Sequence, residues 1–295
     1  MDFRPFRVEL HTAFRGVTER SGVLFHTQGP DGVHHWGEYS PFADYTPRRA
    51  SRWWAAAMEA ARGDWPDPVR DEVAVNAIIP EVPAAQAAAM TIASGCRTAK
   101  VKVGGLGSTL QDAARVEAVA GALGLGGKIR VDANGAWDVD DAVRALTELE
   151  LAARRGGLEG LEFVEQPCAT IPDLAALRRR VDTLIAADES VRLPGDADAV
   201  VAANAADIIV LKVAPLGGVR ACLEIAERSG LPVVVSSAME SSVGLAAGLA
   251  LARALPDLPY ACGLGTSLLL ATDTVAEPLV PVDGYLRARE LEVIA

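Results

Sequence analysis

Histidine is scarce in this sequence and is missing from most of it. The chain of 295 residues has four histidines, and all of them fall within the first 35 positions. The rest of the chain therefore lacks the side chain that most often ligates zinc, completes a serine-histidine-aspartate triad or acts as a general base. Any catalytic site beyond residue 35 must use other acids, bases and metal ligands.

Cysteine is also sparse, with four residues (Cys96, Cys168, Cys222 and Cys262) and no Cys-x-x-Cys spacing. This pattern is typical of reduced thiols in a cytoplasmic protein rather than of a disulfide framework. The amino terminus lacks the apolar core of a signal peptide, and no apolar run approaches the ~20 residues that span a bilayer. We therefore predict a cytoplasmic protein without a membrane partner.

Long basic runs are absent as well. The formal net charge is −11, and the longest run of lysine and arginine is Arg178–Arg180. This balance argues against a nucleic-acid partner and against an anionic membrane surface. Half of the residues are hydrophobic, which is enough for a sizeable core in one large domain or in a barrel with a smaller companion. The sequence does not indicate an oligomeric state.

From residue 72 onward, short apolar runs typical of buried strands alternate with helical stretches rich in alanine and leucine. Polar residues end several runs at regular intervals: Asp132 and Glu165 are 33 residues apart, and Asp188, Lys212 and Ser236 then follow at intervals of 23, 24 and 24. A strand with its crossover helix needs about 30 residues or slightly fewer. The pattern predicts an α/β fold, a modified (β/α)7β barrel of the TIM type over residues 72–273, with its first strand at 72–80 and its eighth at 259–262.

The first 71 residues follow another pattern. Three alternating segments separated by turn residues predict an antiparallel meander, and an apolar stripe predicts a helix over residues 47–62. These elements indicate a small α+β domain that precedes the barrel. The tail, residues 274–295, has no evident barrel role, and we expect it to return to this first domain.

Three carboxylates stand at the ends of three successive predicted strands: Asp132, Glu165 and Asp188. In a parallel barrel the carboxyl ends of the strands meet at one rim, where active sites form. Buried charges are costly unless they are paired or bind a metal. Hard oxygen ligands without nearby histidine or cysteine favour Mg²⁺, and Mn²⁺ could replace it. The alternative is a row of solvent-exposed strand-end charges.

Lysines lie on both sides of these carboxylates. Lys100 and Lys102 share one face of their predicted strand, and Lys212 ends a strand beyond the carboxylates. Lysines that face a metal-held substrate carboxylate indicate removal of the proton next to that carboxylate. A lysine can act as this base when burial near other cations lowers its pKa. We therefore predict an enzyme that acts on a small carboxylate substrate.

Five motifs together resemble the muconate-lactonizing-enzyme branch of the enolase superfamily: Lys100-Val-Lys102, Val131-Asp-Ala-Asn-Gly-Ala-Trp137, Phe163-Val-Glu-Gln-Pro167, Ala187-Asp-Glu-Ser190 and Lys212. The superfamily is a standard instance of a lysine base acting with Mg²⁺. The resemblance covers the whole chain, because the meander and helix are similar to the capping domain of that branch. Within the branch, the short cap, Trp36–Phe42 and Ser236–Ser242 resemble the o-succinylbenzoate synthase family.

The resemblance implies a reaction and roles for the charged residues. The reaction would be metal-dependent syn dehydration of 2-succinyl-6-hydroxy-2,4-cyclohexadiene-1-carboxylate to o-succinylbenzoate in menaquinone biosynthesis. Lys102 would remove the α-proton and then protonate the departing hydroxyl, Lys100 would tune it, and Lys212 would stabilise the anion from the opposite side by its charge or by a cation–π contact. The implied metal ligands are Asp132, Glu165 and Asp188.

The candidate substrate-binding residues are Ser236, Ser237, Asn134, Arg15 and Arg20. The two serines fall where the family places groups that hold the succinyl side chain. The arginines lie in a predicted loop of the first domain that would close over the site. Solvated loop arginines are the alternative for that pair.

Other activities stay open at this stage. A dipeptide epimerase would need an acid at the end of the eighth strand, where this chain has Cys262-Gly-Leu-Gly-Thr266. N-acylamino acid racemase and muconate cycloisomerase activities are compatible with the same lysines. A non-catalytic barrel that binds a metal or a small acid is a different class, against which the inward lysines argue because their burial is costly.

Overall fold

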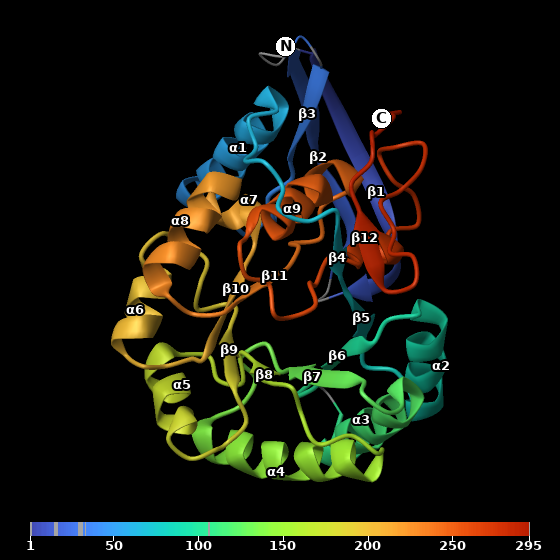
Figure 1. Ribbon diagram of the computed structural model, residues 1–295, viewed down its shortest axis with the longest axis vertical. Coiled ribbons are helices and arrows are strands. Elements are labelled where there is room, and N and C mark those ends of the chain that lie inside the picture. Colours follow the sequence, from blue (N-terminus) through green and yellow to red (C-terminus); the bar gives the residue numbers. More distant parts are fainter. Residues whose placement is uncertain (1, 15–16, 29–31, 33, 106, 295) are drawn as a thin grey trace.

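The computed structural model describes residues 2–14, 17–28, 32, 34–105 and 107–294. A curled parallel sheet forms the centre of the molecule, and helices surround its outer face (Figure 1). The sheet order runs from the last strand to the first without interruption. Its strands are β5 (Asn76–Ile79), β6 (Thr98–Lys102), β7 (Lys128–Asp132), β8 (Val164–Glu165), β9 (Ile185–Ala187), β10 (Ile208–Leu211) and β11 (Val233–Val235).

The helices of the barrel lie in the stretches between the strands, where the sequence predicts alternating helices. Serine, aspartate and threonine side chains cap three of them at Ser108, Asp138 and Thr170, where each accepts a hydrogen bond from a first-turn amide. A short helix after β10 was not predicted. The helices are α2 (Ala84–Ser94), α3 (Thr109–Leu123), α4 (Val139–Arg155), α5 (Ile171–Arg178), α6 (Asp196–Ala202), α7 (Val213–Leu216), α8 (Val219–Ser229) and α9 (Ser242–Ala254).

The barrel closes without the predicted eighth strand. Residues 259–262 do not form a strand; single parallel bridges join Cys262 to Val75 and Gly263 to Ser236. The Cys262 amide donates to the Ala74 carbonyl over 2.7 Å, and the Gly263 amide donates to the Val235 carbonyl over 2.8 Å. The segment pairs too briefly on each side to count as a strand, yet it supplies the backbone hydrogen bonds that complete the ring.

The predicted first strand is divided in two. Its beginning, β4 (Glu72–Ala74), pairs antiparallel with β12 (Tyr285–Arg287) from the carboxyl-terminal tail, and only β5 joins the barrel sheet. The tail also contacts the first domain, because Val275 packs in one cluster with Phe6 and Val8. Figure 1 shows the carboxyl terminus beside β1.

The first domain has the predicted meander and helix. Its strands β1 (Asp2–Phe14), β2 (Val17–Gln28) and β3 (His34–Tyr39) form an antiparallel sheet, and α1 (Pro47–Arg62) packs on β3. Pro47 begins the helix and Gly63 ends it in a left-handed conformation. We call residues 2–62 the capping domain; they lie at the top of the molecule in Figure 1, where α1 packs on α7 and β3 packs on α9.

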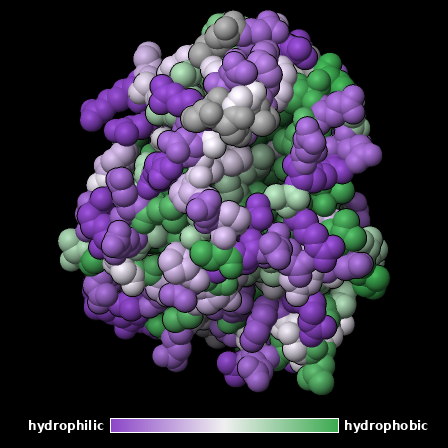
Figure 2. Space-filling view, turned by 45° about the horizontal axis from the view of Figure 1, so that its top comes forward, coloured by the Kyte–Doolittle hydropathy of each residue, from purple (hydrophilic) through white to green (hydrophobic). Residues whose placement is uncertain are grey.

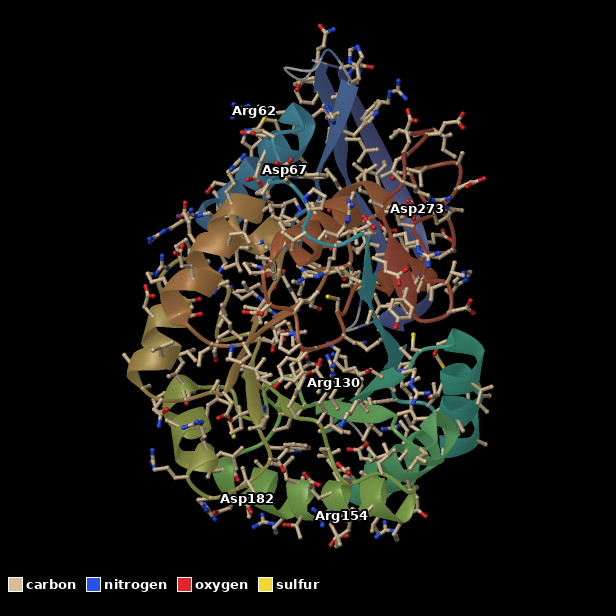
Figure 3. The ribbon with its side chains drawn as sticks, in the orientation of Figure 1. Arg62, Asp67, Arg130, Arg154, Asp182 and Asp273 are labelled. Atoms are coloured by element: carbon tan, nitrogen blue, oxygen red, sulfur yellow. The ribbon has the colours of Figure 1, made fainter. Side chains whose placement is uncertain are left out.

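Strand side chains divide between two environments. Val101 and Val103 belong to the core cluster that joins the sheet to the helices, whereas Lys100 and Lys102, which alternate with them, point into the barrel. Deeper in the barrel, the fully buried Arg130 guanidinium lies 4.4 Å from the centre of the Phe163 ring and donates to Glu162. Figure 3 shows Arg130 inside the ring of strands.

The molecular surface is mixed in character. The face in Figure 2 is mainly hydrophilic, with hydrophobic side chains scattered among charged ones. Among the described residues, no helix combines the length and the apolar character that crossing a membrane requires.

Gly37 tests how tightly the capping helix packs on β3. A Cβ at this position would lie 2.1 Å from the Ala57 carbonyl oxygen of α1, which cannot move without shifting the helix. We expect Gly37→Ala to lower the free energy of unfolding by about 1–3 kcal/mol, as overpacking commonly does. Gly121→Ala is the matched control, because its Cβ would meet only the Gly156 carbonyl oxygen at 3.9 Å. Urea denaturation of both variants checks the expectation, which an unchanged Gly37→Ala protein would contradict.

Candidate active site

Strand register brings the predicted site residues into one row at the barrel mouth. Lys102 pairs in register with Asp132, and Asp132 pairs with Glu165, so three adjacent strands end in charged side chains at the same height. Asp188 follows β9 directly, and Lys212 follows β10. Because parallel strands share one direction, all five meet at the carboxyl-terminal rim.

Lys100 and Lys102 are paired with the first two carboxylates. The Lys102 Nζ lies 2.5 Å from Asp132 Oδ2 and donates to Asn134 Oδ1 over 2.9 Å. The Lys100 Nζ donates to Glu165 Oε1 over 3.0 Å and lies 3.3 Å from Asp132 Oδ2. The side chains of Asp132 and Glu165 are 0% and 1% exposed, so these ion pairs are shielded from water.

The third carboxylate has two cationic partners. Lys212 Nζ donates to Asp188 Oδ2 over 2.8 Å, and Arg192 Nη2 lies 2.6 Å from Asp188 Oδ1. The other Arg192 nitrogen, Nη1, donates to the Asp188 carbonyl. Arg192 was not among the predicted site residues. It lies four positions after Asp188 in the loop that follows β9, where spacing alone does not show which way the chain turns.

The carboxylates respond unequally to burial. Burial raises the pKa of Glu165 to about 7, and the neighbouring charges of Asp132 and Asp188 act in the same direction against Lys100. Burial acts on Asp132 and Asp188 as well, but their cationic partners outweigh it and lower both pKa values. The three buried carboxylates repel one another, and a bound cation would relieve this repulsion.

The lysines also differ from one another. Burial acts to lower the pKa of Lys100, but Glu165 and both aspartates outweigh this and raise it. Burial lowers the pKa of Lys212, and the adjacent Arg192 guanidinium lowers it further. Lys212 is therefore more easily deprotonated than an ordinary lysine.

Gln166, which was not among the predicted site residues either, holds two strand ends together. Its Oε1 accepts from the Asp188 and Ser190 amides over 2.9 and 3.1 Å, and its Nε2 donates to Ser190 Oγ over 2.8 Å. Its φ of 39° is in the left-handed region, as is that of Asn134 at 49°. Such backbone conformations persist in non-glycine residues only where the surroundings enforce them.

A small cavity of about 70 Å³ lies above the charged row. The predicted Asn134, Ser236 and Ser237 line it. Ser237 Oγ lies 2.6 Å from Thr266 Oγ1, and Ser236 Oγ donates to the Gly263 carbonyl over 3.5 Å. Further lining residues that were not among the candidate site residues are Phe42, Tyr45, Ile78, Arg192, Pro215, Ala238, Met239, Gly263 and Thr266.

The described residues include oxygen donors suited to a metal ion, but these donors are not arranged around one common position. No group of three or more histidine, cysteine, aspartate or glutamate side chains in the described ranges is arranged to hold an ion. The donor chemistry nevertheless fits a hard divalent cation, since three buried carboxylates end adjacent strands. The assignment of Asp132, Glu165 and Asp188 as ligands therefore stays a prediction.

Comparisons with known proteins agree with this architecture. Residues 83–292 match the family described as enolase C-terminal domain-like, and residues 6–61 match enolase N-terminal domain-like. The chain is 56% identical to the o-succinylbenzoate synthase of Thermobifida fusca, over 99% of this chain and 89% of that protein. It is 50% identical to the o-succinylbenzoate synthase of Mycobacterium tuberculosis, over 96% of this chain and 81% of that one.

The chain belongs to the o-succinylbenzoate synthase family of the enolase superfamily.

Solved structures of other superfamily members share the fold. The L-Ala-D/L-Glu epimerase of Bacillus subtilis has a TM-score of 0.83 at 24% identity, with 99% of this chain and 96% of that chain covered. Muconate lactonizing enzyme from Pseudomonas putida has a TM-score of 0.78 at 24% identity, with 99% and 94% covered. At these identities the likeness concerns the fold alone, so the o-succinylbenzoate synthase family rests on the closer relatives.

Of the two arginines predicted to bind substrate from a loop of the capping domain, the structure describes one. Arg15 lies outside the described residues. Arg20 was expected in a loop, and that expectation was wrong: it lies within β2 and is 4% exposed. Its guanidinium donates to the carbonyls of Ser40 and Met239 rather than lining the cavity. The β1–β2 pairing extends further than the turn residues suggested, so Arg20 faces the barrel from a strand.

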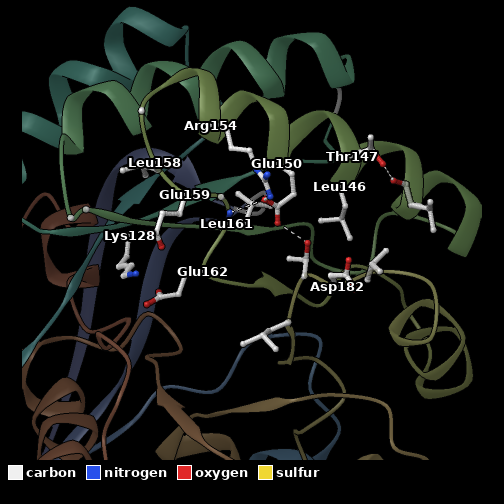
Figure 4. A pocket seen from close by; sticks show the side chains of 18 of the residues that line it. Lys128, Leu146, Thr147, Glu150, Arg154, Leu158, Glu159, Leu161, Glu162 and Asp182 are labelled. Atoms are coloured by element: carbon white, nitrogen blue, oxygen red, sulfur yellow. Dashed lines mark hydrogen bonds and ion pairs between the residues drawn. The ribbon is translucent and has the colours of Figure 1, made fainter.

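A larger groove of about 780 Å³ lies at the other end of the barrel. It runs between α4 and the starts of the strands, where Lys128 begins β7 four residues before Asp132 ends it (Figure 4). Glu150 accepts there from Thr183 Oγ1 over 2.7 Å and from the Leu161 amide over 3.1 Å. In such barrels the amino-terminal face contributes to stability and the active site forms at the carboxyl-terminal face. The groove therefore lies at the face opposite the charged row.

The buried side chain of Glu240, beside the cavity, should make the stability of the protein depend on pH. Burial raises its pKa to about 7, with Glu38 acting in the same direction and Arg20 against it. Between about pH 4.5 and 7 the native state keeps a proton that the unfolded state has lost, so stability falls as the pH rises. Glu240→Gln lacks this loss and keeps an acceptor for the Ala238 amide. We expect its free energy of unfolding, relative to wild type, to increase from pH 5 to pH 8 in urea denaturation.

The control for this series is Glu148→Gln on the exposed face of α4, whose difference from wild type should not follow the same trend. A Glu240→Gln difference that is constant with pH, or that decreases, would contradict the effect of burial.

Proposed function

We propose that this chain dehydrates 2-succinyl-6-hydroxy-2,4-cyclohexadiene-1-carboxylate to o-succinylbenzoate with a divalent metal ion, and that the product serves menaquinone biosynthesis. Membership of the o-succinylbenzoate synthase family supports the activity. The observation that carries the mechanism is the buried row at the barrel mouth, with Lys102 and Asp132 on one side and Lys212 on the other. Four buried free cysteines support a cytoplasmic location.

Lys102 is the proposed base and acid. In its neutral form, its Nζ takes the proton from the carbon next to the substrate carboxylate. The same ammonium then returns the proton to the departing hydroxyl, so that water leaves and the ring becomes aromatic. Asn134 Oδ1 and Asp132 Oδ2 both contact this nitrogen, and they orient it toward the cavity. One group can serve both steps because the two bonds broken lie on the same face of the ring.

Lys212 and Lys100 have supporting roles. Lys212 lies across the cavity and provides a fixed positive charge for the anion that forms when the proton leaves. Lys100 pairs with Glu165 and Asp132, so it adjusts the charge around Lys102 and does not itself take the proton from the reacting carbon.

A divalent cation completes the proposal. Asp132, Glu165 and Asp188 would hold Mg²⁺, or Mn²⁺ in its place. When bound, the ion would stabilise negative charge on the substrate carboxylate. The chain's own contribution is to keep these carboxylates buried at one height, with Gln166 fixing the Asp188 backbone.

The cavity wall formed by Ser236 and Ser237 is the proposed binding site for the succinyl side chain, with Asn134 near the ring carboxylate. Phe42 and Tyr45 of the segment between β3 and α1 cover the cavity, which excludes water from the anion.

Racemisation of N-acylamino acids is the second candidate. A racemase needs a proton-transferring base on each face of the substrate. The lowered pKa of Lys212, caused by burial and by Arg192, favours a second base opposite Lys102. The dehydration needs only one.

Turnover with and without metal tests the function. We expect the purified protein to aromatise the cyclohexadiene substrate, to lose activity in excess chelator and to regain it with Mg²⁺ or Mn²⁺. Ultraviolet absorbance of the product measures the rate, and polarimetry with N-acylated amino acids measures the competing reaction. Full activity in excess chelator would contradict the metal dependence. Absence of turnover with every carboxylate would instead indicate a non-catalytic binding protein.

Lysine variants test the roles. Lys102→Ala should abolish both dehydration and exchange of the α-proton into deuterated solvent. Lys212→Ala should lower the rate by roughly 10²–10³, because it removes a preorganised charge beside the anion. Lys212→Arg keeps that charge and should retain exchange, which mass spectrometry of the recovered ligand measures. Lys128→Ala, at the opposite end of β7, is the matched control and should keep full activity.

Exchange that survives in Lys102→Ala but disappears in Lys212→Ala would reverse the assignment of the two lysines.

A further inference from the structure

One wall of the cavity is a buried segment between β11 and α9, residues Ser236–Ser241. Its first four residues line the cavity, and the whole segment is buried. Met239 within it has a φ of 65°, a left-handed conformation that a non-glycine residue keeps only where its surroundings hold it. Two charged side chains of the capping domain bind this segment from behind.

Arg20 of β2 is the first of these side chains. Its Nε donates to the Met239 carbonyl over 3.1 Å, and its Nη2 donates to the Ser40 carbonyl. Its guanidinium lies 4.3 Å from the centre of the Phe42 ring, and Phe42 itself lines the cavity. A single buried cation therefore joins the strained residue of the wall to the aromatic side chain that covers the cavity.

Glu38 of β3 is the second. Its Oε2 accepts from Ser241 Oγ over 2.6 Å and from the Gly244 amide over 2.9 Å, and both its oxygens accept from the Ser241 amide. A carboxylate in this position satisfies free amides at the amino terminus of α9 and interacts favourably with the helix dipole. A Cβ on Gly244 would lie 2.9 Å from Glu38 Oε2, so the close approach requires glycine.

We propose that Arg20 and Glu38 are positioning residues through which the capping domain fixes the Ser236–Ser241 wall in the shape that accepts the distal side chain of the substrate. This rests on the proposed function, because the wall is assigned there to the succinyl group. Neither residue contacts the reacting carbon. Their loss should loosen binding of the side chain and leave the lysine chemistry intact.

The two contacts are complementary in chemistry. Arg20 binds a carbonyl of the wall, whereas Glu38 binds amides just beyond it, so together they fix both ends of the turn at Met239 and Ser241. Hydrogen bonds to charged groups are stronger than neutral ones when they are buried. A capping domain that docked only through apolar contacts would not fix the wall's backbone in this way.

The experiment compares a ligand that has the side chain with one that lacks it. In the full chain, Arg20→Met should raise KM and weaken inhibition by o-succinylbenzoate about tenfold, while kcat and inhibition by benzoate change less than about threefold. Arg20→Lys keeps the charge and should recover part of the loss. Arg7→Met is the control, because Arg7 is an exposed cap arginine that pairs with Glu19.

A second variant keeps the test decisive if Arg20→Met fails to fold. Ser241→Ala removes one hydrogen bond to Glu38 and should give a smaller selective loss, about twofold to threefold, for o-succinylbenzoate. Equal losses for both ligands, a fall in kcat alone, or no change would overturn the positioning role. A wild-type protein that neither dehydrates the substrate nor binds o-succinylbenzoate would instead overturn the proposed function, and this proposal with it.

Discussion

The compensation of buried charge at the barrel mouth is the constraint on which the rest of the structure depends. Asp132, Glu165 and Asp188 are almost completely buried, and each lies within an ion pair with a lysine or an arginine. Removing one partner of such a pair leaves a charge without solvation, which is far more costly than losing a surface ion pair. The strand register places Lys102, Asp132 and Glu165 at the same height, so that the opposite charges lie side by side.

The capping domain docks on the barrel through the same kind of interaction. Glu38 caps the amino terminus of α9, and Glu59 of α1 accepts from the Val219 and Arg220 amides at the start of α8. The Glu59 carboxylate therefore lies at the amino terminus of α8, directly after the pair Gly217–Gly218. Two helix dipoles thus orient a domain whose side chains also cover the cavity.

Much of this arrangement could be predicted from local patterns. Strand periodicity predicts that Lys100 and Lys102 face the barrel while Val101 and Val103 face the helices, and the contacts agree. The regular spacing from Asp132 to Ser236 predicts strand ends at one rim, since each βα unit returns the chain to the same edge. Helix α1 begins and ends where its proline and glycine indicate.

The sequence by itself determined the barrel, the capping domain and the identity of the charged row, because these depend on short-range periodicity and on residue type. The tertiary structure decided which long-range partners complete them: Arg192 beside Asp188, Gln166 across two strand ends, and Arg20 on Met239. It also divided the first strand, because β4 pairs with the distant β12, and it closed the ring through Cys262 and Gly263 instead of an eighth strand. These features join residues that are far apart in the chain or that depend on how a loop turns, and local patterns carry no signal for either.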